Sequence, residues 1–319
     1  MTWADHWGVI GVIRIIKGDC IKSLKKLEDA SINTCITSPP YWGLRNYNDE
    51  EKQLGLEDTP EEFVNNLVKV FREVKRVLRD DGTVWLNLGD SYNAGRNGGH
   101  AGGSKQNHKK YLQRSGANVV GLTPKDLIGI PWRVALALQQ DGWYLRQDII
   151  WHKPNPMPES VKDRCTKAHE YIFLLSKNPK YYFDNEAIKE DAKYPDGPTS
   201  AHAIRKGVGD PKMQTRNGLH KIGANPKRNK RSVWTVTTKP FKGAHFATFP
   251  MDLIEPCVLA GCPENGTVLD PFAGSGTTGI VAANNERNAV LLELNEEYIN
   301  LAKERINTQI GLWAEVVDD

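Results

Sequence analysis

The pattern of apolar and polar positions predicts strands and helices that alternate along most of the chain. Short apolar runs bounded by glycine, proline or charged residues are typical of buried strands, whereas apolar residues three and four apart are typical of helices. The predicted strands are residues 9–16, 32–36, 83–88, 143–151, 171–175, 267–269 and 289–292. The predicted helices are residues 21–27, 60–78, 131–140, 251–260, 277–284 and 296–306. This alternation implies βαβ units, and therefore an α/β fold with a mostly parallel sheet and helices on both faces.

The boundaries of several elements are marked by residues of known local preference. Thr59 precedes the predicted helix 60–78 as its N-cap, and Pro60 takes the first helical position. Asp81-Gly82 is expected to turn the chain into the strand 83–88.

Two segments break the α/β pattern and carry most of the local positive charge. Residues 92–123 are rich in glycine, asparagine and serine, and contain five basic residues and no acid. Residues 201–233, within a second irregular block at about 186–233, contain nine lysines or arginines and one acid. The whole chain has a net charge of only +3, so this clustering is more informative than the average. The first segment is expected to be a flexible insertion. The charge of the second favours contact with phosphates, and the alternative for this segment is a solvated flexible loop.

The composition places the 319 residues in an ordinary globular class. The sequence has no apolar stretch near the roughly 20 residues that cross a bilayer, and its N-terminus lacks a signal-peptide pattern. The five cysteines are odd in number and scattered, which favours reduced thiols in the cytoplasm. No metal is expected, because Cys257 and Cys262 have no second pair or His partners at zinc spacing, and His152 and His169 are expected to satisfy local hydrogen bonds.

The segment Thr37-Ser38-Pro39-Pro40-Tyr41-Trp42 follows a predicted strand and forms a stiff, non-helical loop. Consecutive prolines fix φ and remove backbone donors, and each proline keeps the preceding residue extended. Backbone carbonyls, a hydroxyl and an aromatic ring are thereby presented together. The loop is suited to holding a small planar group that carries an NH2, although a structural proline turn would have the same local features.

The segment 270–279, with the sequence DPFAGSGTTG, follows a predicted strand and opens a helix. Its glycines allow a sharp turn and close approach of a ligand, and the helix N-terminus favours a carboxylate. Asp270 would attract an ammonium, and Glu293, at the end of the next strand, is placed to hold a ribose. The segment lacks the spacing of dinucleotide and phosphate loops. A ligand with ammonium, carboxylate, ribose and purine fits these features, and S-adenosylmethionine is such a ligand.

With both motifs in place, the chain resembles the amino-methylating DNA methyltransferases. Their S/D/N-P-P-Y/F/W motif holds the target amino group, and their D-P-F-x-G-S-G-T motif holds the methyl donor. The catalytic motif comes first in this chain, as in the circularly permuted β-arrangement of that family. Supporting similarity is present at residues 17–20, 149–155 and 245–250.

The resemblance implies a Rossmann-like methyltransferase fold in a single domain spanning residues 1–319. Its catalytic half would be residues 9–185, its target-recognition insertion about 186–233, and its cofactor-binding half 241–310. The catalytic residues would be Ser38, Pro39, Pro40 and Tyr41. The residues binding S-adenosyl-L-methionine would be Asp19, Phe249, Pro250, Asp270, Pro271, Phe272, Gly274, Ser275, Gly276, Thr277 and Glu293. The residues binding DNA would be Arg205, Lys206, Arg216, Lys227, Arg228, Lys230 and Arg231.

The expected reaction is transfer of a methyl group to an exocyclic amino group of a base flipped out of duplex DNA. Ser38 Oγ and the carbonyl of Pro39 would accept from the amino group, and Tyr41 would stack on the base. Serine at position 38 favours cytosine N4 within this family, whereas aspartate favours adenine N6, so adenine stays the alternative. A second alternative is a catalytically inactive DNA-binding protein of the same fold. Protein glutamine methylation is disfavoured by Ser38.

Two further expectations follow from this interpretation. Pro256-Cys257 has the dipeptide of carbon-5 cytosine methyltransferases, but it lies in an apolar helical segment, so Cys257 is expected to be buried. The partners would be double-stranded DNA and a cognate restriction endonuclease, with no membrane, and the protein would be a monomer or homodimer in the cytoplasm.

Overall fold

The computed structural model describes residues 11–43, 54–93, 122–192, 226–238, 249–311 and 316–318. The chain divides into two compact units. The larger unit is formed by the chain up to Phe183 and from Ser232 onward, and the smaller by Asp184–Arg231. No helix within the described residues is long and apolar enough to cross a membrane.

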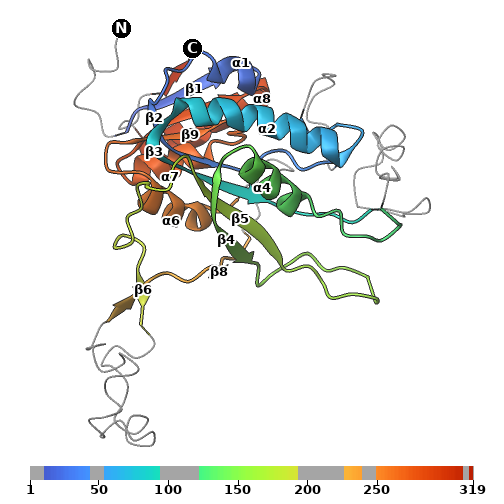
Figure 1. The fold of residues 1–319 in the computed structure, drawn as a ribbon. Coiled ribbons are helices and arrows are strands. Elements are labelled where there is room, and N and C mark those ends of the chain that lie inside the picture. The colour runs from blue at the N-terminus through green and yellow to red at the C-terminus, as the bar shows by residue number, and fades with distance from the viewer. Residues whose placement is uncertain are drawn as a thin grey trace, which may run out of the picture. The chain divides into compact units, whose positions relative to one another are not determined.

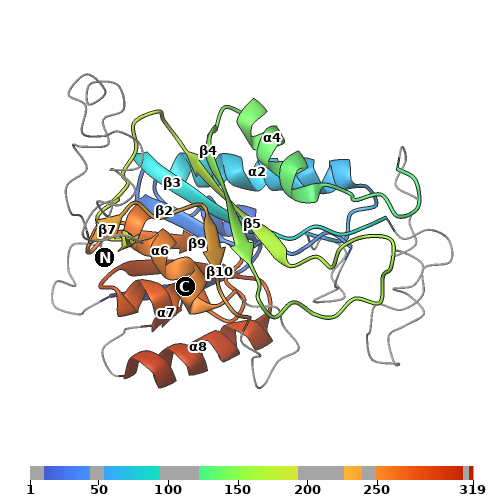
Figure 2. The same cartoon turned by 90° about the horizontal axis from the view of Figure 1, so that it is seen from below.

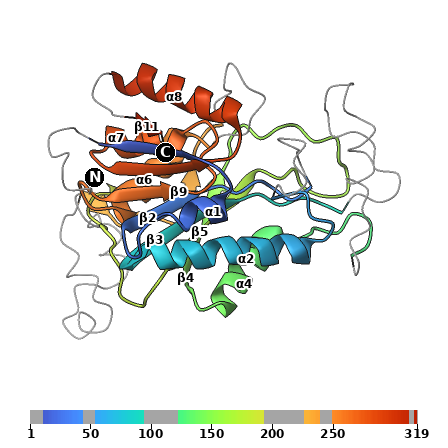
Figure 3. The same cartoon turned by 90° about the horizontal axis from the view of Figure 1, so that it is seen from above.

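A nine-stranded mixed sheet forms the centre of the larger unit, in the order β11-β1-β10-β9-β2-β3-β5-β4-β8. The strands are β1 (Ile13–Lys17), β2 (Ile32–Thr37), β3 (Leu78–Leu88), β4 (Tyr144–His152), β5 (His169–Ser176), β8 (Val233–Thr235), β9 (Thr267–Asp270), β10 (Asn288–Glu293) and β11 (Val316–Asp318). The six strands from β11 to β3 are all parallel. β5 is antiparallel to both β3 and β4, and β8 is parallel to β4. The first described strand, β1, thus lies between β10 and β11, the last two, as the blue and red ribbons of Figure 3 show.

Helices cover both faces of this sheet. One face carries α1 (Cys20–Leu24), α2 (Pro60–Val77) and α4 (Ile130–Gln140), and the other carries α6 (Met251–Gly261), α7 (Thr277–Asn284) and α8 (Glu296–Ile310) (Figures 1 and 2). The apolar stripe of α2 is fully buried, with Phe63, Leu67 and Phe71 in the core between sheet and helices. The predicted Rossmann-like α/β fold is therefore confirmed.

The N-terminus of α2 has the predicted cap. The Thr59 hydroxyl accepts a hydrogen bond from the backbone N–H of Glu62 at 3.1 Å, and Pro60 occupies the first turn. This arrangement satisfies one of the donors that a helix start leaves open.

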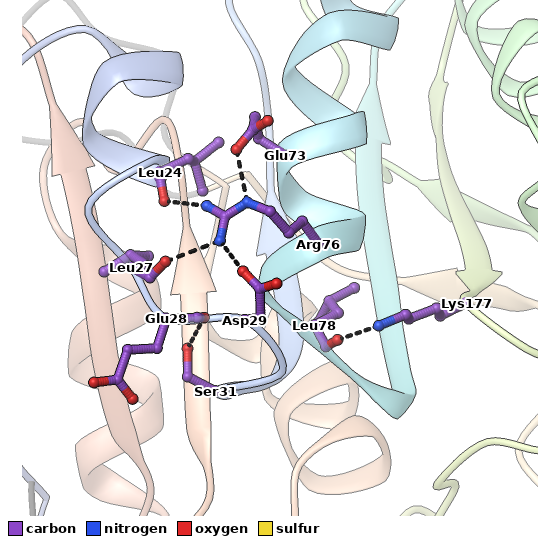
Figure 4. A network of polar contacts seen from close by, with 9 residues as sticks. All are labelled: Leu24, Leu27, Glu28, Asp29, Ser31, Glu73, Arg76, Leu78 and Lys177. Atoms are coloured by element: carbon purple, nitrogen blue, oxygen red, sulfur yellow. Dashed lines mark hydrogen bonds and ion pairs between the residues drawn. The ribbon is translucent and has the colours of Figure 1, made fainter.

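Arg76, near the other end of α2, joins this helix to α1 (Figure 4). Its guanidinium donates to the carbonyls of Leu24 and Leu27 at 2.8 and 3.0 Å, and pairs with Asp29 and Glu73. The Leu24 carbonyl ends α1 and the Leu27 carbonyl lies in the segment after it, so one arginine joins α2 to the end of α1 and to the chain that follows.

The predicted turn at Asp81-Gly82 is wrong. β3 begins at Leu78 and passes through these residues, with an irregularity: Ile32 of β2 pairs with Leu78, whereas Thr34 pairs with Thr83. Extra residues of β3 are thus accommodated as a bulge inside the strand, and the local residue preferences of such a bulge are the same as those of a turn. The sequence also did not predict the short strands β8 and β11, because three-residue strands have too little periodicity to detect.

The smaller unit contains the antiparallel pair β6 (Glu190–Asp191) and β7 (Lys227–Arg228). It lies within the segment expected to be the target-recognition insertion. Most of the other expected insertion, residues 92–123, lies outside the described residues. Its two ends are held together by Asn93, whose side chain donates to the carbonyls of Leu122 and Thr123.

Candidate active site

The strand order brings the two sequence motifs to one edge of the sheet. β9 and β2 are parallel neighbours, with Cys35 paired to Leu269, so the segments that follow them leave the sheet side by side. The carboxyl ends of β1, β10 and β3 lie at the same edge. This edge is where open α/β sheets place their ligand sites.

The loop from Ser38 to Tyr41 follows β2 without regular secondary structure, as two consecutive prolines require. Pro39 is buried, whereas Ser38, Pro40 and Tyr41 are half-buried. The Tyr41 hydroxyl donates to Oε2 of Glu170 at 2.7 Å, and the Tyr41 ring packs on Gly89 so closely that a Cβ there would lie 2.6 Å from the ring. The end of the loop is thus anchored to β5 and to the residue after β3.

The second motif forms a tight turn between β9 and α7. Gly274 and Gly276 have φ of +51° and +75°, values that side chains with a Cβ rarely adopt. A Cβ on Gly276 would lie 2.9 Å from Ala302 of α8, whereas a Cβ on Gly274 would meet nothing within 4 Å. Gly276 therefore permits helix packing, and Gly274 leaves an open face where the backbone can meet a ligand.

A buried hydrogen-bond cluster joins the two motifs. Asp270 is only 1% exposed, and its Oδ1 accepts from Thr37 Oγ1 at 2.7 Å and from the N–H of Phe272 at 3.1 Å. Its Oδ2 accepts from Thr278 Oγ1 at 2.6 Å. Burial raises the pKa of Asp270 to about 6, against the lowering effect of these donors. Both oxygens of the carboxylate are thus engaged within the chain, and its expected contact with a ligand ammonium stays a prediction.

Glu293, at the end of β10, supports the glycine turn from the other side. Its Oε2 accepts from the N–H of Gly274 at 2.8 Å, and its Oε1 accepts from the N–H groups of Leu294 and Asn295. Burial raises the pKa of Glu293, and the backbone donors oppose that rise. Asp19 follows β1, the neighbour of β10, and caps α1 by accepting from the N–H of Lys22 at 3.0 Å. The structure therefore gathers Asp19, Gly274 and Glu293 along one stretch of the sheet edge.

Arg305 of α8 holds the far side of the glycine turn, and the sequence did not predict this role. Its guanidinium donates to the carbonyl and hydroxyl of Ser275 and to Thr277 Oγ1 at 3.1 Å. Burial lowers the pKa of Arg305. Ser275 and Thr277 thus use their hydroxyls to hold the loop to a helix. A lone arginine in an amphipathic helix gives no signal of such a contact, because it is equally typical of a solvated face.

The remaining predicted ligand residues lie around the same edge. Pro271 is buried beside Asp270, and Phe272 is half-buried against the core. Pro250 is buried directly before α6, and Phe249 is half-buried. The preceding residues of that motif, 245–248, lie outside the described residues.

The basic residues predicted to bind DNA are divided by the structure. Arg205, Lys206 and Arg216 lie outside the described residues, whereas the four from Lys227 to Arg231 lie in the smaller unit. Arg228 and Arg231 both pair with Glu190 across the β6–β7 pair, and Lys227 lies 3.4 Å from Asp191. Part of this positive charge therefore stabilises the unit itself.

Cysteine and histidine side chains occupy local structural positions. Cys257 is buried in α6, as predicted, and its Sγ lies 3.9 Å from the carbonyl of Leu253. His152 Nδ1 lies 3.1 Å from Thr235 Oγ1. Across the described ranges, no group of three or more His, Cys, Asp or Glu side chains could hold a metal ion.

Comparison with known proteins identifies the family of this chain. A family model described as DNA methylase matches residues 32–304. The type II methyltransferase M.Cfr9I of Citrobacter freundii is 47% identical over 292 residues, covering 92% of this chain and 87% of that protein. The type II methyltransferase M.XycI of Xanthomonas campestris pv. cyanopsidis is 48% identical over 295 residues, covering 92% and 88% of the two chains. Among solved structures, a putative DNA modification methylase of Thermus thermophilus, TTHA0409, solved in complex with S-adenosyl-L-methionine, is 26% identical with a TM-score of 0.59, covering 96% and 100%.

The chain therefore belongs to the DNA methylase family of N6 and N4 methyltransferases. The family resemblance inferred from the two motifs is confirmed.

Proposed function

We propose that this protein transfers a methyl group from S-adenosyl-L-methionine to the exocyclic N4 amino group of cytosine in double-stranded DNA. The observation that carries the proposal is the hydrogen bond between Thr37 and Asp270, because it fixes the proline loop beside the glycine turn. A methyl donor on one loop and an amino group on the other would then be neighbours, as in-line transfer needs.

The glycine turn fits the methyl donor. Gly274 offers open backbone at a positive φ, two residues before Gly276, the N-cap of α7, and the N-terminus of that helix favours a carboxylate. Asp19 and Glu293 would hold the adenosine part of the ligand at the ends of β1 and β10. When bound, S-adenosyl-L-methionine supplies a methyl group on a positively charged sulfur.

The proline loop supplies acceptors for the target amino group. The lone pair of an exocyclic amino group is delocalised into the base, so the amino group is a poor nucleophile. Ser38 Oγ and the Pro39 carbonyl would each accept a hydrogen bond from one N–H of this amino group. The two bonds would favour a tetrahedral nitrogen. The prolines hold that carbonyl in place before the reaction, so stabilisation comes from preorganisation and needs no covalent enzyme intermediate.

The target base has to leave the duplex to reach this loop, and Tyr41 would stack on the flipped base. The basic residues of the 201–231 segment would contact the phosphates. Ser38 supports cytosine, by resemblance to the serine-containing members of the family. The same family includes adenine-N6 enzymes, so adenine is the alternative target.

Mass spectrometry of nucleosides from DNA treated with the protein and S-adenosyl-L-methionine tests the proposal. N4-methylcytosine is the expected product. N6-methyladenine would overturn the choice of base and keep the reaction class. No methylated nucleoside, with cofactor binding absent in calorimetry, would instead favour an inactive DNA-binding protein. We also infer a cytoplasmic location. We further infer a restriction endonuclease that cuts the same site, and protection of the methylated DNA from cleavage by that enzyme would test this.

A further inference from the structure

Glu170, which has no role in the proposed reaction so far, lies at the centre of a hydrogen-bond network that includes Tyr41. Its Oε2 accepts from the Tyr41 hydroxyl at 2.7 Å and from Asn87 Nδ2 at 3.3 Å. Its Oε1 pairs with Lys153 Nζ. The Glu170 side chain is only 15% exposed and that of Lys153 only 18%, so this ion pair is largely withdrawn from solvent.

The mixed part of the sheet explains why these residues meet. β5 runs against β3, so its first residues lie at the edge where β3 ends. β4 runs against β5, with Trp151 paired to Glu170, so its last residues reach that edge too. Glu170 therefore faces the proline loop although it is 129 positions away from Tyr41 in the sequence.

Each partner restricts Glu170 further. Asn87 is buried in β3 and also donates to the carbonyl of Tyr171 at 3.1 Å, which fixes its amide. The Lys153 ammonium lies 4.2 Å from the centre of the Trp151 ring, and the Trp151 N–H donates to the carbonyl of Val236 at 2.8 Å. Asn87 and Lys153 are thus fixed by contacts of their own, and both hold the Glu170 carboxylate. Glu170 is therefore a rigid acceptor for the Tyr41 hydroxyl.

We propose that Glu170 is the positioning residue of the proline loop, and that it fixes the Tyr41 ring so that a flipped base stacks level with Ser38 Oγ and the Pro39 carbonyl. This inference rests on the proposed function. The ring already packs on Gly89 along one side, and the hydroxyl bond to Glu170 stops its rotation and tilt. Lys153 neutralises the carboxylate, which would otherwise repel an approaching DNA backbone.

Three variants test the role of Glu170 against the full-length wild-type protein. Tyr41→Phe removes the hydroxyl and keeps the ring, Glu170→Gln keeps the shape and removes the charge, and the third variant combines both. Glu73→Gln is the matched control, because Glu73 forms a similar part-buried ion pair with Arg76 at the opposite end of β3. Calorimetry with S-adenosyl-L-methionine shows that each variant is folded.

The measurement is the single-turnover rate of methyl transfer to a duplex carrying the target site. We expect each single variant to lose between about fivefold and a hundredfold in this rate, with affinity for the cofactor within about twofold of wild type. Because both changes break the same contact, the double variant should be no slower than the slower single variant, within about twofold. The control should transfer methyl groups at the wild-type rate.

A second readout follows the ring itself, with 2-aminopurine at the target position of the duplex. Stacking on Tyr41 quenches its emission, so the emission of the complex should rise in both single variants and stay at the wild-type level in the control. Losses that multiply in the double variant, or unchanged emission in Glu170→Gln, would overturn the positioning role while leaving the proposed function intact. A wild-type protein that transfers no methyl group would overturn both.

Discussion

Thr37 Oγ1 donates a hydrogen bond to Asp270 Oδ1 at 2.7 Å across 233 positions of sequence, and both side chains are buried. Thr37 is the last residue of β2 and Asp270 the last of β9. The bond therefore joins the residue before the proline loop to the residue before the glycine turn. Because β2 and β9 are neighbouring strands, the sheet sets the distance between the two proposed binding loops.

Thr37→Val should destabilise the protein and misplace the proline loop. It removes a donor to a buried carboxylate, and we expect a loss of about 1.5–3 kcal/mol in the free energy of unfolding, measured by denaturant titration. Thr34→Val is the matched control, since Thr34 lies on the same strand and is equally buried but donates to the Thr83 carbonyl. The control should lose about 1 kcal/mol and keep the methyl-transfer rate. Equal effects of the two variants on that rate would contradict the special role of Thr37.

Asp270 should make stability depend on pH in a direction unusual for an aspartate. Its folded pKa is raised by burial from 3.8 to about 6, so the folded state binds the proton more tightly than the unfolded state. This contribution is fully present below about pH 3.8 and is lost as pH rises through about 6. The free energy of unfolding of wild type, minus that of Asp270→Asn, should therefore increase by up to about 3 kcal/mol between about pH 7 and pH 4. A difference that falls over this interval would show that the folded pKa is lowered instead.

Gly274→Ala and Gly276→Ala should separate ligand binding from folding. Gly276→Ala combines a positive φ with a Cβ 2.9 Å from Ala302, so we expect a cost of roughly 2–4 kcal/mol in stability. Gly274→Ala adds its methyl group in open space and should cost only about 1 kcal/mol. Calorimetry should nevertheless show the greater loss of S-adenosyl-L-methionine affinity in Gly274→Ala, because the methyl group occupies the face where the ligand approaches. Wild-type affinity in this variant would place the ligand elsewhere.

Ser38→Ala should remove methyl transfer and keep cofactor binding. The hydroxyl is one of the two proposed acceptors for the target amino group, and we expect the single-turnover rate to fall by about a hundredfold or more. The affinity for S-adenosyl-L-methionine should stay within about twofold of wild type, since Ser38 lies on the other loop. A variant that retains full activity would refute the proposed acceptor.

The basic residues near β7 should differ in how much they contribute to stability, because Asp191, the partner of Lys227, is far more exposed than Glu190, the partner of Arg228 and Arg231. Lys227 and Lys230 changed together to Gln should lower DNA affinity and reduce the slope of log K against log salt by about 0.9 for each lost phosphate contact. Arg228 and Arg231 changed together to Gln should also lower thermal stability, because Glu190 loses the two arginines with which it pairs. An unchanged salt slope in the lysine variant would move the DNA contacts to other residues.

Local pattern was sufficient for most elements of the larger unit. The spacing of Phe63, Leu67 and Phe71, with Thr59 as cap, predicted α2 because helix formation depends on residues close in sequence. The bulge in β3 could not be predicted, because Asp81-Gly82 has the same local preference in a turn and in a bulge. Its pairing with β2 decides between the two.

The sequence by itself determined the family and the two loops, because proline and glycine act on their own backbone and leave a recognisable motif. Only the tertiary structure decided which side chains hold those loops. Asp270 is recognisable as part of a motif, yet its bond to Thr37 depends on β9 lying beside β2. Glu170 and Arg305 carry no local signal at all, since their contacts with Tyr41 and Ser275 arise from strand order and helix packing. Contacts between distant residues form only when the sheet is assembled. In a single sequence, an acid or an arginine that makes such a contact looks the same as one that does not.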